Sequence, residues 1–153
     1  MSIWLKILVT IGLSFISGLL YHLGGGAEKG YNTKWRDWGC SLIALICLWL
    51  LKGLNFAFWW GYIAFFLLSW GALSTYWKKG VDAKAINWFF HGFGCGLATI
   101  PFYWLGIHWW AILVRTVILG LTMMWWSENN DDVFWEEGGR GTLIILTLPI
   151  LLI

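Results

Sequence analysis

Charged residues are scarce in this chain. Only 12% of its 153 residues are Asp, Glu, Lys or Arg, whereas soluble domains average roughly 25%. Hydrophobic residues make up 59%, and a soluble fold of this size could not bury so much apolar surface. The net charge is only +2 and no basic run is present, which argues against a nucleic-acid partner. We therefore predict an integral membrane protein, whose apolar surface is solvated by lipid.

Cysteine is also rare. The three cysteines, Cys40, Cys47 and Cys95, all lie in hydrophobic runs. Their spacing matches neither a zinc site nor a disulfide framework, so we expect them to be small residues of the membrane core. The apolar N-terminal stretch lacks the charged n-region and the cleavage site of a signal peptide, and we interpret it as a retained first span.

Long apolar runs are what the chain does contain. They cover residues 3–21, 39–54, 56–77, 86–107, 108–126 and 141–153. A bilayer core needs about 20 helical residues, and the second and sixth runs reach that length only if their helices begin earlier, near Trp35 and Trp135. Charged residues then fall in the first turns of these helices: Arg36, Asp37, Glu136 and Glu137. The sequence predicts an all-α integral membrane protein, a single polytopic domain of residues 1–153 with six transmembrane helices.

Segments of the chain resemble one another. FWWGYIAFFLLSWGALSTYW at 58–77 is similar to HWWAILVRTVILGLTMMWW at 108–126, and WFFHGFGCGLATIPF at 88–102 is similar to WEEGGRGTLIILTLPI at 135–150. The two prolines, Pro101 and Pro149, fall at nearly the same place in the second pair. WRDWGCSLIALI at 35–46 matches more loosely. We therefore predict three pseudo-repeated helical hairpins, at about 3–54, 56–107 and 108–153.

The hairpin arrangement predicts an orientation in the membrane. It places the three polar loops on one side, together with more cations than the other side carries. The loop side holds Lys29, Lys34, Arg36, Lys78, Lys79, Lys84 and Arg140, and the other side holds Lys6, Lys52 and Arg115. Because an excess of Lys and Arg marks the cytoplasmic side, we expect cytoplasmic loops, in a membrane that is most simply the bacterial inner membrane.

Ionisable residues open the second helix of each hairpin. These are Arg36 and Asp37, then His91, and then Glu136, Glu137 and Arg140. Hairpins packed around one axis would bring these residues together, and charges at membrane depth tend to face the interior of a bundle. We therefore predict a shared interfacial site in which His91, Glu136, Glu137 and Asp37 are candidate catalytic residues. The alternative is structural, with the glutamates paired to Arg140 and His91 bonded to a backbone carbonyl.

The same site has candidate ligands for phosphate and for metal. Arg36, Arg140, Lys78 and Lys79 have the charge to bind a phosphate group. Asp132 and Glu136 are four residues apart on a predicted helix and could hold Mg²⁺. The alternatives are that the lysines beside the membrane spans contact lipid headgroups and that the acidic run is a solvated loop.

The charged residues at the helix starts allow three hypotheses for the function of the protein. The first hypothesis is an enzyme that acts on a lipid or polyprenyl phosphate, with His91 as the general acid or base. The second is a homo-oligomeric channel or transporter, including a phage-type pore lined by the same charges. The third is a membrane adaptor that binds another protein. The pattern resembles small membrane proteins of phage and bacterial genomes, but no motif attaches it to a named family.

Two further features of the spans carry predictions. Gly92 and Gly96 form a GxxxG pattern in an apolar run, which is typical of closely packed helices within or between chains. Arg115 lies inside the fifth apolar run. We expect its long side chain to extend towards the membrane boundary, as arginines near helix ends commonly do; the alternative is a pairing with a buried acid.

Overall fold

The computed structural model describes residues 1–23, 34–74, 84–130 and 133–153, with side chains described for 1–23, 36–73, 86–130 and 138–153. Six α-helices follow one another: α1 (Ile3–Leu23), α2 (Lys34–Lys52), α3 (Trp59–Ser74), α4 (Lys84–Leu97), α5 (Trp109–Asn129) and α6 (Val133–Leu146). Short 3-10 helices precede α3 and follow α4 and α6: η2 (Phe56–Phe58), η4 (Ile100–Leu105) and η5 (Leu148–Leu152). The described segments contain no strand, so the all-α prediction is confirmed.

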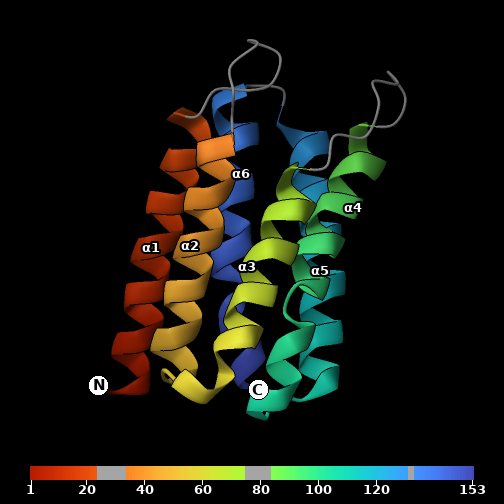
Figure 1. Cartoon of the computed structure of the whole chain (residues 1–153). Coiled ribbons are helices and arrows are strands. Elements are labelled where there is room, and N and C mark those ends of the chain that lie inside the picture. Colours follow the sequence, from red (N-terminus) through yellow and green to blue (C-terminus); the bar gives the residue numbers. More distant parts are fainter. Residues whose placement is uncertain (24–33, 75–83, 131–132) are drawn as a thin grey trace.

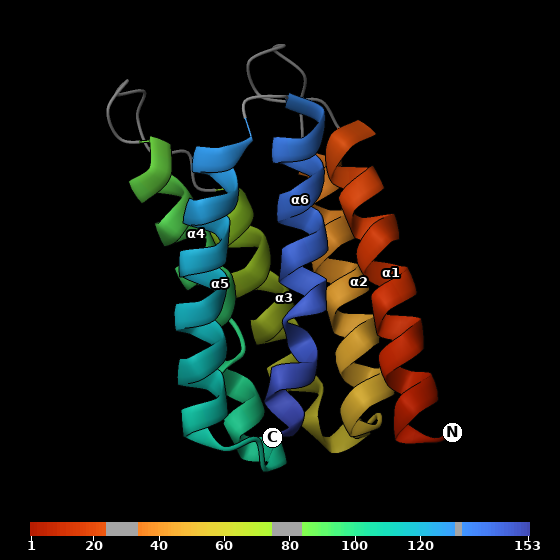
Figure 2. The same ribbon diagram turned by 180° about the vertical axis from the view of Figure 1, so that it is seen from behind.

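The six helices form a closed antiparallel bundle. Each helix packs against its neighbours in the chain, and α1 also packs against α6, which closes the ring (Figures 1 and 2). The ends of α1, α3 and α5 and the starts of α2, α4 and α6 lie together, and both chain termini lie at the opposite end. We call these two ends the loop end and the terminus end.

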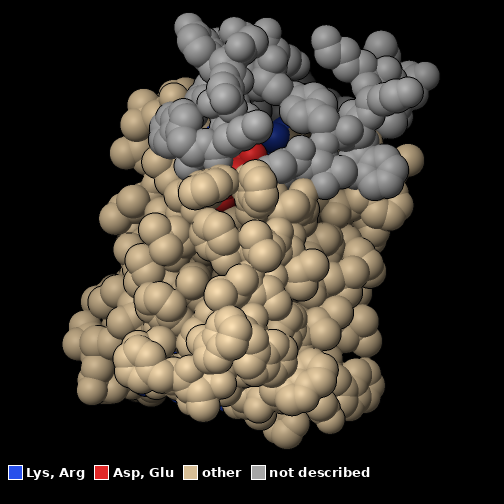
Figure 3. All heavy atoms as spheres, viewed as in Figure 1, with Lys and Arg blue, Asp and Glu red and all other residues tan. Residues whose placement is uncertain are grey.

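The outer surface of the bundle is apolar. Helix α1, the segment Phe56–Leu73 and α5 are each long and apolar enough to cross a membrane. Large side chains such as Trp4, Leu8 and Phe15 are exposed along α1, and the face seen in Figure 3 shows almost no charge over its described residues. Such a surface is compatible with lipid around the bundle.

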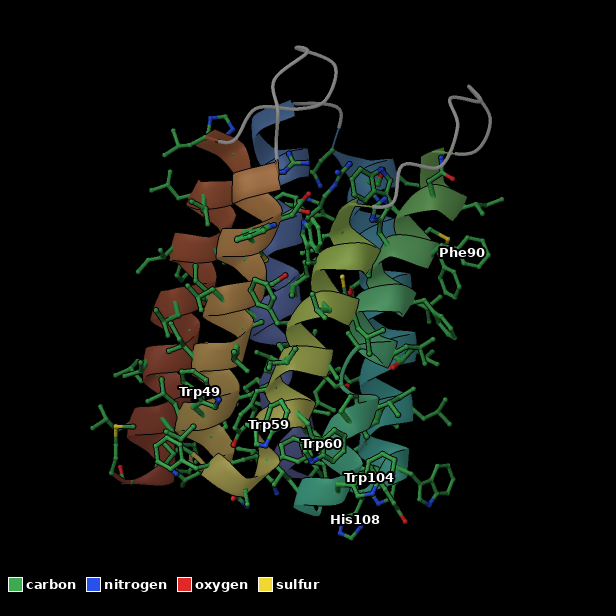
Figure 4. The ribbon with its side chains drawn as sticks, viewed as in Figure 1. Trp49, Trp59, Trp60, Phe90, Trp104 and His108 are labelled. Carbon is green, nitrogen blue, oxygen red and sulfur yellow. The ribbon has the colours of Figure 1, made fainter. Side chains whose placement is uncertain are left out.

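Aromatic side chains gather at the terminus end. Trp59, Trp60 and Trp104 lie there beside His108 (Figure 4), and the rings of Trp60 and Trp104 meet edge to face at 5.8 Å. Trp59 and Trp104 are mostly exposed. Because tryptophan prefers the boundary between lipid and water, this end of the bundle is suited to that boundary.

Helices α2 and α6 begin where their short apolar runs required. They start at Lys34 and Val133, just before Trp35 and Trp135. The early start predicted for both helices is therefore confirmed. The first turns of α2 and α6 accordingly contain Arg36, Asp37 and Glu136.

The fourth apolar run differs from the continuous helix that was expected. Helix α4 ends at Leu97, and η4 follows with Pro101 in its first turn. Helix α6 gives way to η5 in the same manner at Pro149. Thr99 and Thr147, which precede the two 3-10 helices, share a φ of −84° and have ψ angles of −2° and −9°. Proline has no backbone N–H to continue an α-helix, so each Thr-x-Pro sequence changes the helix type.

Small residues allow two helix pairs to approach closely. Gly92 and Gly96 of α4 lie against the α5 backbone at Leu119 and Thr116. The GxxxG prediction is thus confirmed as a contact within one chain. On the other side of the ring, Gly18 of α1 lies against Gly138 and Thr142 of α6, and Gly141 of α6 lies against Ser17. The α1–α6 contact therefore depends on Ser and Gly, because larger residues would hold the backbones apart.

The interior between the helices is filled by apolar side chains. Buried residues of this core include Phe65, Phe102, Leu119, Met123, Ile144, Ile145 and Leu148. Cys40, Cys47 and Cys95 are also buried and form no disulfide. Their prediction as small core residues is confirmed.

Candidate functional site

A polar cluster lies inside the loop end of the bundle. Its members are Tyr21 of α1, Arg36 and Asp37 of α2, His91 of α4 and Arg140 of α6, and we call them the loop-end cluster. Tyr21 contacts Arg36 and Asp37, and Arg140 and His91 both lie beside the ring of Trp88. Four helices from all three predicted hairpins therefore contribute to one site.

Arg36, Asp37 and Tyr21 form its most buried part, with exposed fractions of 5%, 3% and 2%. The Tyr21 hydroxyl donates to Asp37 Oδ1 at 3.3 Å, and Arg36 Nε lies 3.5 Å from the same oxygen. The Arg36 guanidinium also lies over the Tyr21 ring, 4.4 Å from its centre. Asp37 is in the first turn of α2, where the helix dipole favours a negative charge. This pairing and hydrogen bonding offset the cost of burying two charges.

Arg140, Trp88 and His91 form the second part. The Arg140 guanidinium stacks on the Trp88 ring, so that a side chain of α6 contacts a side chain of α4. The His91 ring lies 5.4 Å from the Trp88 ring and is tilted by 33° to it. His91 also hydrogen-bonds to the backbone of Ala72 in α3, as the structural alternative for this residue anticipated. The histidine is therefore oriented by the backbone of α3 and by the Trp88 ring of its own helix.

The structure brings together some predicted site residues and leaves others outside its description. Arg36, Asp37, His91 and Arg140 meet at the loop end. Other predicted residues lie outside the described side chains: Lys78, Lys79, Asp132, Glu136 and Glu137. Among the side chains that are described, no group of three His, Cys, Asp or Glu residues is arranged to hold a metal. The Mg²⁺ site at Asp132 and Glu136 stays a prediction.

Tyr21 and Trp88 are partners that sequence reasoning did not assign to the site. Tyr21 precedes Asp37 by 16 residues, across a polar loop, and nothing in that spacing pairs them. Trp88 marked the repeat but gave no sign of a stack with Arg140. Both contacts depend on how the helices are rotated about their axes.

The prediction that Arg115 extends to the membrane boundary is wrong. Its side chain is only 1% exposed and points into the bundle. Nη1 donates to the carbonyl of Cys95 at 3.3 Å, and Nη2 donates to the carbonyl of Ile144 at 2.9 Å. Both carbonyls lie just before a Thr-x-Pro break, where the α-helical hydrogen bonding ends. Backbone acceptors inside the bundle therefore replace water as partners of this guanidinium.

In comparisons with protein-family models, curated proteins and solved structures, nothing matches this chain. The chemistry of the loop-end cluster is then the main guide to function. Two guanidiniums can bind an anionic group by charge-assisted hydrogen bonds, while an imidazole and a carboxylate can transfer protons. These abilities together suit a phosphate-bearing ligand at a membrane boundary.

Proposed function

We propose that the chain crosses the membrane six times as three related helical hairpins. The alternating direction of α1 to α6 supports this topology, as do the three long apolar segments. The common backbone geometry at Thr99 and Thr147 supports a relation between the second and third hairpins. With the loop end in the cytoplasm, the loop-end cluster lies at the cytoplasmic boundary of the inner membrane.

On this scaffold, the loop-end cluster binds and acts on the phosphate group of a lipid or polyprenyl phosphate. The observation that carries the proposal is that Arg36 of α2 and Arg140 of α6 stack on Tyr21 and Trp88 at the loop end, with His91 beside Trp88. The acyl or prenyl chain of such a ligand would lie in the lipid that surrounds the bundle. Its phosphate would remain at the boundary, at the depth of the cluster.

Each residue has a distinct role in this proposal. Arg36 and Arg140 hold the phosphate oxygens, and Asp37 with Tyr21 fixes the direction of the Arg36 guanidinium. His91 transfers a proton to or from the reacting oxygen. Glu136, Glu137 and Asp132 supply a base or a Mg²⁺ ligand, and Lys78 and Lys79 add positive charge beside the site.

Binding is tested with Arg140→Gln in lipid nanodiscs that contain phosphatidic acid. We expect the variant to bind this lipid about 10- to 100-fold more weakly, because a hydrogen bond to a charged group contributes roughly 1.5–3 kcal/mol. Native mass spectrometry measures the bound lipid. Lys52→Gln is the control, since Lys52 is an exposed cation at the terminus end of α2. Equal binding by the two variants would reject Arg140 as a phosphate ligand.

Catalysis is tested by phosphate release from phosphatidic acid and from a polyprenyl phosphate. We expect His91→Ala to lower turnover by about 10²- to 10⁴-fold, the usual contribution of a general acid or base, while lipid binding persists. The assignment of an enzyme fails if His91→Ala and Glu136→Gln both retain the turnover of the unaltered protein.

Transport is a second candidate, and the paired helix breaks favour it. Helices interrupted at corresponding positions of two repeats commonly mark the binding site of a transporter. Ion flux into liposomes, measured together with the oligomeric state, distinguishes the two functions. A monomer without flux would exclude the pore and leave the interfacial enzyme.

A further inference from the structure

Arg115 is among the largest fully buried side chains of the bundle. It projects from α5 to the places where α4 and α6 change into 3-10 helices. We propose that the backbone carbonyls at the two Thr-x-Pro breaks form a cation site, and that the Arg115 guanidinium is the cation that permanently fills it. This inference is independent of the function proposed for the loop-end cluster.

The break after α4 leaves one carbonyl without its usual donor. In an uninterrupted α-helix the amide of Thr99 would donate to the carbonyl of Cys95, four residues earlier. The Thr99 amide instead donates to Gly96 at 3.1 Å, and the Thr99 hydroxyl donates to the same carbonyl at 2.6 Å. The Cys95 carbonyl is consequently available to Arg115 Nη1.

The break after α6 also presents one carbonyl to Arg115, with a different pattern of backbone bonds. The Thr147 amide still bonds to Leu143, at 3.2 Å, but the Ile144 carbonyl accepts from side chains. Arg115 Nη2 donates to it at 2.9 Å, while the Thr147 hydroxyl lies 3.0 Å from the Leu143 carbonyl and 3.3 Å from the Ile144 carbonyl. One guanidinium therefore bonds to both breaks and ties α4 and α6 to α5.

The surroundings of Arg115 are those of a cation bound by carbonyls rather than of an ion pair. The hydrogen-bond acceptors of its side chain are the two backbone carbonyls, and its buried Nε has no hydrogen-bond partner in the described structure. Carbonyls at interrupted membrane helices are the ligands that such proteins use for small cations. The covalent attachment of the guanidinium to α5 keeps the site occupied without a free ion.

Chemical rescue tests this inference directly. Arg115→Gly removes the guanidinium, and we expect Tm in detergent to fall by on the order of 10 °C, because two buried carbonyls lose donors and a cavity opens. About 10 mM guanidinium chloride should restore at least half of the loss by occupying the vacant site. Urea, which is neutral and has a similar shape, and NaCl at the same concentration should restore little. Equal rescue by urea or NaCl, or no rescue by guanidinium, would overturn the proposal.

A second measurement decides the matter if Arg115→Gly does not fold. Arg115→Met removes the charge and keeps most of the volume of the side chain. Its effect on Tm is measured in the natural chain and in a chain that carries both Pro101→Ala and Pro149→Ala. Alanine restores the amides that would bond to the carbonyls of Leu97 and Ile145, so that α4 and α6 can continue as α-helices. In continuous helices the amides of Thr99 and Leu148 donate to the carbonyls of Cys95 and Ile144. We expect Arg115→Met to lower Tm less than half as much in the alanine background. An equal loss in both backgrounds would show that the carbonyls at the breaks do not bind Arg115 as proposed.

Discussion

Alanine at Gly96 is expected to lower the free energy of unfolding by about 3 kcal/mol, at the upper end of the usual range for overpacking. The added methyl group would meet Cα and the hydroxyl of Thr116 in α5. A flexible side chain could move aside, but Cα belongs to the backbone of the neighbouring helix. The α4–α5 contact would therefore open along its length. Unfolding by SDS titration, followed by tryptophan fluorescence, measures the loss.

Gly12→Ala is the matched control for this experiment. Gly12 lies in α1, and a methyl group there meets nothing within 4 Å. Alanine has the higher helix propensity, so this variant should be neutral or gain up to about 1 kcal/mol. If Gly96→Ala proved as stable as Gly12→Ala, the close approach of α4 and α5 would be incorrect.

The substitution Asp37→Leu is expected to lower the free energy of unfolding by about 3–5 kcal/mol, as is usual when one partner of a buried ion pair is removed. The substitution leaves the Arg36 charge buried without the neighbouring carboxylate, and the Tyr21 hydroxyl loses its acceptor. Chemical unfolding in detergent measures this loss. Adding Arg36→Met to Asp37→Leu removes the buried charge, and at least half of the lost stability should return. Additive losses from the two substitutions would mean that Arg36 and Asp37 do not interact energetically.

The sequence contained enough information to place the helix starts and one helix contact. Trp35 and Trp135 marked the starts of α2 and α6. The apolar runs that follow them are too short to span a bilayer, so each helix had to begin earlier, at residues that include charged ones. Gly92 and Gly96 revealed the α4–α5 contact through their spacing. The break at Pro101 was not foreseen, since hydropathy measures the polarity of side chains and does not report a missing backbone donor.

The grouping of the site was also predictable, whereas its internal pairing was not. Arg36, Asp37, His91 and Arg140 lie near the start of the second helix of each predicted hairpin, and packing around one axis was expected to bring these helix starts together. The stack of Arg140 on Trp88 and the bond from Tyr21 to Asp37 depend on helix rotation, which arises from contacts between distant segments. Arg115 was misjudged for the same reason, because its helix is apolar on every face and gives no sign of which side is buried.

The contact between α1 and α6 also governs the order in which the protein can assemble. Gly18 meets Thr142, which the ribosome adds about 120 residues later, or roughly 6–25 s at about 5–20 residues per second. During that interval Ser17 and Gly18 have no α6 to cover them, so the face of α1 that later packs against α6 stays open. If synthesis stalls before α6 is made, the face of α1 that would pack against α6 therefore stays uncovered.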